Sequence, residues 1–212
     1  MRSKQQVGGL VLAALCTIAM PSVARAQNAC GKEWKIPAVG SWAEWSGKEG
    51  KTRLSVIDQE DKAGKTLYRV EVGNGGNVMQ MVVPAFPWEI DQVEEMVMQR
   101  PGQAPMKMSG QMLQMMRSHM PANNGGPGDL AKKCAAMKVV GEESITVPAG
   151  TFKATHLKND TGDEVWASAD VPFSVIKYSG KEGQTLLTAT GKDAKTALTG
   201  TPTEMQMGMP RQ

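Results

Sequence analysis

The most constraining feature of this sequence is a succession of short segments rich in β-forming residues, separated by turns that contain glycine. In the first half the segments cover residues 41–45, 52–58, 66–72 and 77–83, and the turns cover 47–50, 61–64 and 73–76. Glycine supplies the positive φ angles that tight hairpin turns need. Connections this short join antiparallel neighbours, because parallel neighbours need a crossover of a dozen or more residues. The first half therefore predicts an antiparallel meander.

The same pattern returns after residue 138. Strands are predicted around 145–147, 152–156, 164–168, 174–179 and 185–190, again with turn residues between them. Eight or nine strands at this spacing are typical of an all-β domain. The predicted fold class is therefore mainly β, a curved antiparallel sheet with one or two inserted helices.

The middle of the chain is interrupted by proline at positions 84, 87, 101, 105 and 121. Proline ends strand pairing and breaks helices, so residues 88–98 are predicted to be helical or irregular and residues 106–120 to form a helix. Ten of the 16 methionines fall between Met79 and Met120. We therefore expect a methionine-rich helical insertion around residues 88–121.

The predicted helix carries its methionines on one face. The positions i, i+4, i+7, i+8 and i+11 are occupied by Met108, Met112, Met115, Met116 and His119, and residues at these spacings lie on the same side of a helix. Burying a methionine contributes about 1.5 to 3 kcal/mol. We therefore expect this face to point into the concave side of the sheet.

Three roles are open for the methionines. They can be core packing alone. They can line a deformable apolar surface, because methionine is flexible and polarisable, and the ligand-binding residues are then Met108, Met112, Met115 and Met116. Their thioethers can also bind a soft metal such as Cu(I) or Ag(I), and the ligands then come from Met106, Met108, Met112, Met115, Met116, His119 and Met120.

The first 26 residues have the parts of a secretory signal peptide. Arg2 and Lys4 form a basic start, residues 7–20 form an apolar run, and Ala24-Arg25-Ala26 is a small-x-small cleavage site. The apolar run is shorter than the ~20 residues that span a bilayer. We expect cleavage after Ala26, no integral membrane segment in the mature chain, and location in the periplasm.

Cleavage changes the charge balance. The whole chain has 24 basic and 21 acidic residues, and removing Arg2, Lys4 and Arg25 leaves 21 of each. A neutral chain lacks the clustered cations that nucleic-acid binding needs. The two remaining cysteines, Cys30 and Cys134, are predicted to form a disulfide in an oxidising compartment. A thiolate metal pair is the competing interpretation.

No catalytic motif accompanies these features. Acid–base and nucleophilic sites need a base or acid held by partners, and the only histidines are His119 and His156, neither of which lies in a catalytic motif. His156, within a predicted strand, is interpreted as a structural histidine. We therefore expect a non-enzymatic protein with no catalytic residues.

Two motifs in the second half carry a family resemblance. The run Val147-Pro148-Ala149-Gly150-Thr151-Phe152 is followed by a W-x-S-x-D-V-P segment that begins at Trp166. Over residues 134–200 this resembles bacterial envelope proteins related to the lipoprotein-carrier (LolA/LolB-like) half-barrel. The resemblance implies one domain over residues 27–195, with a concave sheet partly covered by helices that shelters an acyl chain or another apolar ligand. Residues 196–212 are predicted to be a disordered tail.

The expected function is that of a periplasmic binding or chaperone-like protein for an apolar lipid or lipoprotein acyl ligand, without a cofactor. The alternative is a periplasmic protein that binds Cu(I) or Ag(I) through its methionine-rich segments. The sequence names neither the ligand nor the oligomeric state.

Overall fold

The computed structural model describes residues 35–119, 132–181 and 183–205. Its strands are β1 (Trp42–Gly47), β2 (Gly50–Lys62), β3 (Lys65–Asn74), β4 (Asn77–Val83), β5 (Glu95–Gln99), β6 (Met106–Ser109), β7 (Lys138–Val147), β8 (Gly150–Lys158), β9 (Glu164–Ala167), β10 (Val175–Gly180), β11 (Gly183–Gly191) and β12 (Thr203–Glu204). The helices are the 3-10 turn η1 (Ile90–Gln92) and α2 (Gly110–His119), and residues 132–135 add one helical turn.

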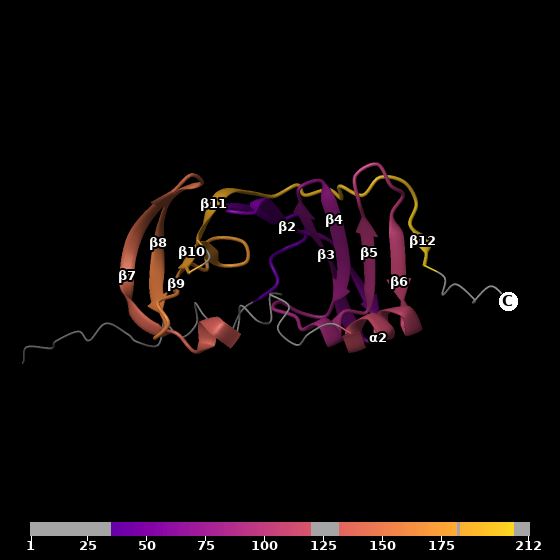
Figure 1. Cartoon of the computed structure of the whole chain (residues 1–212), viewed down its shortest axis with the longest axis horizontal. Helices are drawn as coiled ribbons and strands as arrows, with labels where there is room; N and C mark the ends of the chain where they lie inside the picture. The colour runs from indigo at the N-terminus through magenta and orange to yellow at the C-terminus, as the bar shows by residue number, and fades with distance from the viewer. Residues whose placement is uncertain (1–34, 120–131, 182, 206–212) are drawn as a thin grey trace, which may run out of the picture.

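All the strands belong to one sheet in the order β12-β6-β5-β4-β3-β2-β1-β11-β10-β9-β8-β7 (Figure 1). Its pairings are antiparallel except for the short parallel pair of β12 with β6. The predicted fold class is confirmed: the protein is mainly β, with one open curved antiparallel sheet and one or two helices. There are twelve strands rather than eight or nine because part of the predicted helical insertion pairs as β5 and β6, and because β12 forms in the predicted tail.

Glycine-rich turns form the hairpins as the sequence predicted. Between β3 and β4 the central residues Gly75 and Gly76 have φ angles of 55° and 84°. Positive φ at both central residues defines the type I′ turn, whose twist matches that of the flanking strands. The amide of Asn77 also donates to the carbonyl of Asn74 at 3.2 Å. This turn closes β3 on β4 with Asn74 opposite Asn77.

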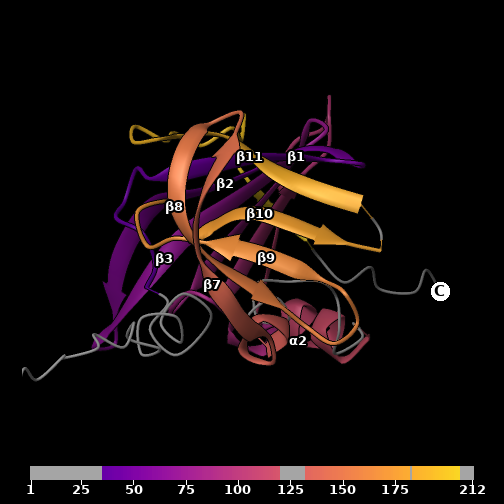
Figure 2. The ribbon, with the colours of Figure 1, turned by 90° about the vertical axis from the view of Figure 1, so that its left-hand side faces the viewer.

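The sheet curves around its main core. Buried side chains from both ends of the sheet, such as Met96 of β5 and Trp166 of β9, belong to one cluster, so they share the inner face. At the β7 end the sheet curls back, and the backbone N–H of Ala149 donates to the carbonyl of Leu187 at 3.2 Å (Figure 2). A smaller cluster around Cys134 and Leu157 lies apart from this core.

The predicted helical insertion differs from the observed one. Residues 88–98 were expected to be helical or irregular, but they contain η1 and strand β5, and residues 106–109 form β6 before α2 begins at Gly110. The physical reason is that the methionines are spaced two residues apart. Met96 and Met98 therefore lie on one face of β5, and each is opposite a methionine of β6 in the ladder. Alternation with period two favours a strand over a helix.

The chain beyond β11 also differs from the prediction. Disorder was expected from residue 196, but residues 192–202, named here the crossing segment, run along one side of the sheet from β11 to β12 (Figure 1). The physical reason is polar pairing: Thr196 and Ala197 hydrogen-bond to Glu71, and Thr199 hydrogen-bonds to Gln99. Residues 206–212 lie outside the described residues.

The signal peptide, Cys30 and Met120 also lie outside the described residues. Within the described part of the chain, no helix is long and apolar enough to span a bilayer.

Candidate functional site

The methionines predicted to share one helical face lie in different surroundings. Met108 belongs to β6 and is 6% exposed, whereas Met115 on α2 is 44% exposed. Met112 and Met116 are half-buried and pack against the main core. The side chain that α2 buries most completely is Leu113. The helix therefore covers one end of the core with Leu113, Met112 and Met116, and the predicted face is divided.

The residues proposed as soft-metal ligands are also spread out. Met106 lies on β6 and is 44% exposed. His119 ends α2, and its Nδ1 lies 2.9 Å from the carbonyl oxygen of Met115. The described residues contain no group of three His, Cys, Asp or Glu side chains that could hold a metal ion. A metal site in this region therefore depends on thioethers.

Methionines do meet across strands β4, β5 and β6. Met81 lies opposite Met96, which lies opposite Met108, and all three are buried; we name them the buried row. Two residues further along, Met79 lies opposite Met98, which lies opposite Met106; we name these the rim row. Four of these six residues, at positions 79, 81, 96 and 98, are absent from the sequence-based site. The signal that could have found them is the repeated M-x-M spacing.

A cleft of about 860 Å³ lies elsewhere, beside β8 and β11. Its walls are residues 35–37 before β1, residues 153–155 of β8, residues 167–174 after β9, and residues 190–192 at the end of β11. The W-x-S-x-D-V-P segment supplies most of the third wall. The sequence analysis assigned this segment to the fold alone, whereas the structure places it on the wall of this cleft.

The cleft is lined by both apolar and polar groups. Ala154, Ala167 and Phe173 give it buried apolar walls. Three lysines, Lys35, Lys153 and Lys192, reach it from three different elements. Lys153 is paired with Glu142 through a 2.9 Å contact between its Nζ and Oε2.

Hydroxyl groups and the carboxylates of Glu142 and Asp170 make up the rest of the polar lining. Ser41, Thr155 and Ser168 are each 8% exposed and all border the cleft. The backbone N–H of Ser168 donates to the carbonyl of Ser174 at 2.8 Å, which holds the loop against the end of β9. Phe173 and Ser174 have φ angles of 61° and 63°. Non-glycine residues rarely adopt this left-handed region, and such residues cluster at binding sites.

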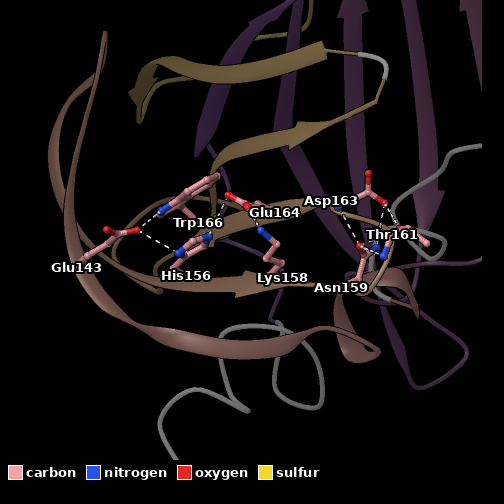
Figure 3. A network of polar contacts seen from close by, with 8 residues as sticks. All are labelled: Glu143, His156, Lys158, Asn159, Thr161, Asp163, Glu164 and Trp166. Carbon is pink, nitrogen blue, oxygen red and sulfur yellow. Dashed lines mark hydrogen bonds and ion pairs between the residues drawn. The ribbon is translucent and has the colours of Figure 1, made fainter.

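A polar network lies on the neighbouring strands (Figure 3). The ring of His156 on β8 stacks on that of Trp166 on β9, with centroids 4.3 Å apart. His156 Nδ1 lies 3.2 Å from Oε1 of Glu143, and Nε2 lies 3.2 Å from Oε2 of Glu164. On the β10 side, the Nζ of Lys177 lies 4.4 Å from the centroid of the Trp166 ring. Every polar group of His156 and the Trp166 ring therefore has a partner.

Two carboxylates at this network, Glu164 and Asp163, are stabilised in their ionised forms. The hydrogen bond from Lys158 lowers the pKa of Glu164 below its usual value, and His156 adds to the effect. In the adjoining turn, the hydrogen bond from Asn159 lowers the pKa of Asp163, with Thr161 contributing (Figure 3). Partners on both ring nitrogens fix the orientation of the imidazole. His156 therefore has the contacts of a structural histidine, which is how the sequence interprets it.

Cys134 is 1% exposed, takes part in a disulfide, and packs with Leu157 and Val165 in the smaller cluster. Its predicted partner Cys30 lies outside the described residues, so the Cys30–Cys134 pairing stays a prediction.

No protein-family model and no curated protein matches this chain. Similar solved structures include a candidate exported protein with a YmcC-like fold from Bacteroides fragilis, with 11% identity and a TM-score of 0.35 over 76% of this chain and 100% of the other. A candidate lipoprotein from Parabacteroides distasonis has 11% identity and a TM-score of 0.31 over the same shares, 76% and 100%. MucB has 14% identity and a TM-score of 0.35, over 82% of this chain and 58% of its own. No family and no function is assigned from likenesses at this level, and the LolA/LolB-like resemblance stays a prediction.

Proposed function

We propose that this protein is a non-enzymatic binding protein that holds an amphiphile, an acyl chain with an acidic head group, in the cleft beside β8 and β11. The observation that carries the proposal is the cleft itself, whose volume of about 860 Å³ falls in the 300–1,000 Å³ range of small-molecule sites. The signal peptide predicted for residues 1–26 supports action outside the cytoplasm.

The lining matches the two parts of such a ligand. Ile36, Pro37 and Pro172 line the cleft and are partly exposed, so they offer apolar surface to a hydrocarbon chain, and each buried methylene contributes about 0.8 kcal/mol. Lys35 and Lys192 stand at the borders of the cleft, where an ammonium group can pair with a carboxylate or phosphate. The hydroxyls of Ser41 and Ser168 add hydrogen bonds that orient the head group.

The first test is to fill the cleft. Ala169 borders it and is exposed, so Ala169→Trp adds an indole there without burying new polar groups. Titration of the mature protein with the fluorescent fatty acid cis-parinaric acid should give saturable binding, which Ala169→Trp should weaken roughly tenfold or more, since a tenfold change needs only about 1.4 kcal/mol. The matched control is Ala104→Trp, at an exposed position between β5 and β6. Equal binding by both variants would contradict the proposal.

The second measurement tests the head group. Lys192→Glu reverses one charge at the border, so it should weaken binding of palmitate and leave binding of hexadecanol, its uncharged counterpart, unchanged. Loss of both ligands to the same degree would show that Lys192 does not read the head group. Absence of saturable binding of either ligand to the unmodified protein would refute the amphiphile site.

A further inference from the structure

The rim row places three thioethers side by side on neighbouring strands. Met79 lies directly opposite Met98, and Met98 lies directly opposite Met106. Directly opposite residues in an antiparallel ladder have β-carbons about 5 Å apart, so the outer two methionines are separated by roughly 10 Å with Met98 between them. Because a methionine side chain has three rotatable bonds, the outer two can turn their sulfur atoms towards the central one. The ladder thus allows three sulfur atoms to converge on one point.

Two of the three rim-row residues are exposed and the third, Met79, is half-buried and packs against the core, whereas the row beside it is fully buried. Met98 and Met106 are 37% and 44% exposed, whereas Met81, Met96 and Met108 of the buried row are 4%, 1% and 6% exposed. The rim row lies two residues from the buried row along the same three strands, so both rows are on the same face of the sheet. Core packing accounts for the buried row. It does not account for methionine at the two exposed positions, Met98 and Met106, where polar residues would be better solvated.

Among the described residues, the ladder neighbours of the rim row include no carboxylate. Beyond Met79 the row continues to Val72 on β3, and beyond Met106 it continues to Thr203 on β12. The charged side chains of β5 and β6, Glu95 and Lys107, alternate with the methionines along these strands, so they lie on the opposite face and pair with each other at 2.7 Å. Neutral thioethers without carboxylates select soft cations, whereas hard divalent cations need oxygen ligands.

We propose that Met79, Met98 and Met106 form a three-thioether site for a soft monovalent cation, Cu(I) or Ag(I). The site is separate from the cleft and independent of the amphiphile proposed there. It also differs from the helical set predicted from the sequence: Met115 points to solvent, while Met112 and Met116 pack against the core. The strand register, rather than the helix, brings the sulfur atoms together.

The test is an anaerobic titration of the mature protein with Cu(I), in competition with the chelator bicinchoninate. The unmodified protein should take up one equivalent in this competition. Met98→Leu removes the central sulfur at nearly constant volume, and cores tolerate such a change well. The substitution should lower the affinity for Cu(I) by at least 10- to 100-fold, because losing even an outer-shell partner of a metal ligand has an effect of this size. The matched control is Met115→Leu, whose residue has the same 44% exposure as Met106 but lies on α2.

Several outcomes would overturn the proposal. They are failure of the unmodified protein to compete for Cu(I), equal affinity of Met98→Leu and the unmodified protein, and a loss of affinity in Met115→Leu. Competition by Zn²⁺ for the same site would also overturn it. Thermal unfolding reports whether Met98→Leu keeps its fold, and Met106→Leu, at a more exposed position, provides a second variant with the same expected loss.

Discussion

At the scale of single residues, the clearest electrostatic arrangement lies on the outer face of β3, β5 and β6. Glu95 accepts from Lys107 at 2.7 Å and from Arg69 at 3.1 Å. Burial alone would raise the pKa of Glu95, but the hydrogen bonds from Lys107 and Arg69 outweigh it and hold the pKa below the ordinary value of 4.5. The hydrogen bond with Glu95 likewise raises the pKa of Lys107 above 10.5. The two shifts set the pH range over which the pair stabilises the fold.

The direction of the pH dependence follows from these shifts. Because the pKa of Glu95 is lowered by folding, its contribution is present above 4.5 and is lost as the pH falls through the lowered pKa. Because the pKa of Lys107 is raised, its contribution is present below 10.5 and is lost as the pH rises through the raised pKa. Glu95→Gln should therefore reduce the free energy of unfolding near neutral pH by about 1 kcal/mol. Buried hydrogen bonds to charged groups contribute more than this, but the partial exposure of Glu95 lets solvent screen the interaction.

Urea unfolding of Glu95→Gln near neutral pH and at about pH 3 measures the effect, because most of the carboxylate contribution disappears in acid. The difference from the unmodified protein should shrink at the lower pH. Glu49→Gln, in the exposed turn between β1 and β2, is the control and should change neither value. A difference that stays constant with pH would show that the ion pair is not its source.

At the scale of elements, the sequence predicted strands far better than it predicted their surroundings. In the sequence of β3, Tyr68, Val70 and Val72 alternate with Arg69 and Glu71, a pattern that predicts one apolar face, and the three apolar side chains do pack in the main core. The pattern did not predict that Glu71 is only 5% exposed, because the cover comes from Thr196, which is 125 positions away. Local pattern determines which side of a strand is apolar. It cannot show whether a distant segment folds over the polar side.

The crossing segment gives a prediction at this scale. Glu71 accepts from Thr196 Oγ1 at 2.6 Å, from the backbone N–H of Ala197 at 2.9 Å and from the amide of Gln80 at 3.0 Å. Glu71→Ala leaves these donors without their acceptor, so it should lower the free energy of unfolding by about 1 to 3 kcal/mol. It should also speed proteolysis within residues 192–202, as local opening becomes easier.

Limited proteolysis followed by intact mass measurement detects this cleavage. Glu60→Ala, at an exposed position of β2, is the control and should be cleaved at the same rate as the unmodified protein. If Glu71→Ala loses stability without faster cleavage of residues 192–202, the segment is held by other contacts.

Helix α2 shows a second limit of sequence reasoning about elements. A period of 3.6 residues placed Met108, Met112 and Met115 on one face, but Met108 lies on β6, outside the helix. The helix instead buries Leu113 and begins at Gly110, whose φ of 50° reverses the chain after β6. One apolar pattern fitted two periods over this short stretch, so the sequence alone did not decide between strand and helix.

At the scale of the whole molecule, the fold class was predictable and the cleft was not. Turn chemistry and alternation predicted a curved antiparallel sheet, and the structure has one. The cleft is assembled from separate segments spread between Lys35 and Lys192, and no local pattern relates them. The W-x-S-x-D-V-P segment was visible in the sequence, but its position on the wall of a cleft depends on how the sheet curls.

The predicted Cys30–Cys134 disulfide can be tested at this scale. Cys134 is buried in the smaller cluster and takes part in a disulfide, so peptide mapping without reduction should find one linked pair that joins it to Cys30. The link closes a loop of about 100 residues, and the chain-entropy model gives such a loop up to ~4 to 5 kcal/mol. Reduction should therefore lower the midpoint of thermal unfolding.

The double variant Cys30→Ser with Cys134→Ser should unfold at the same temperature with and without reductant. Two free thiols in freshly isolated protein would show that the pairing is wrong.

The order of the strands has a consequence for how the chain folds. Among the described strands, nearly every pairing joins two strands that follow each other in the sequence. The exceptions are the pairing of β1 with β11 and that of β12 with β6. Hairpins close within microseconds, whereas pairings between distant residues wait for a costly loop closure. The pairing that sets Trp42 opposite Gly191 is therefore the slow step, and it joins two meanders that have already formed. Substitutions in β1 should slow folding, while substitutions in β12, the last strand to dock, should mainly speed unfolding.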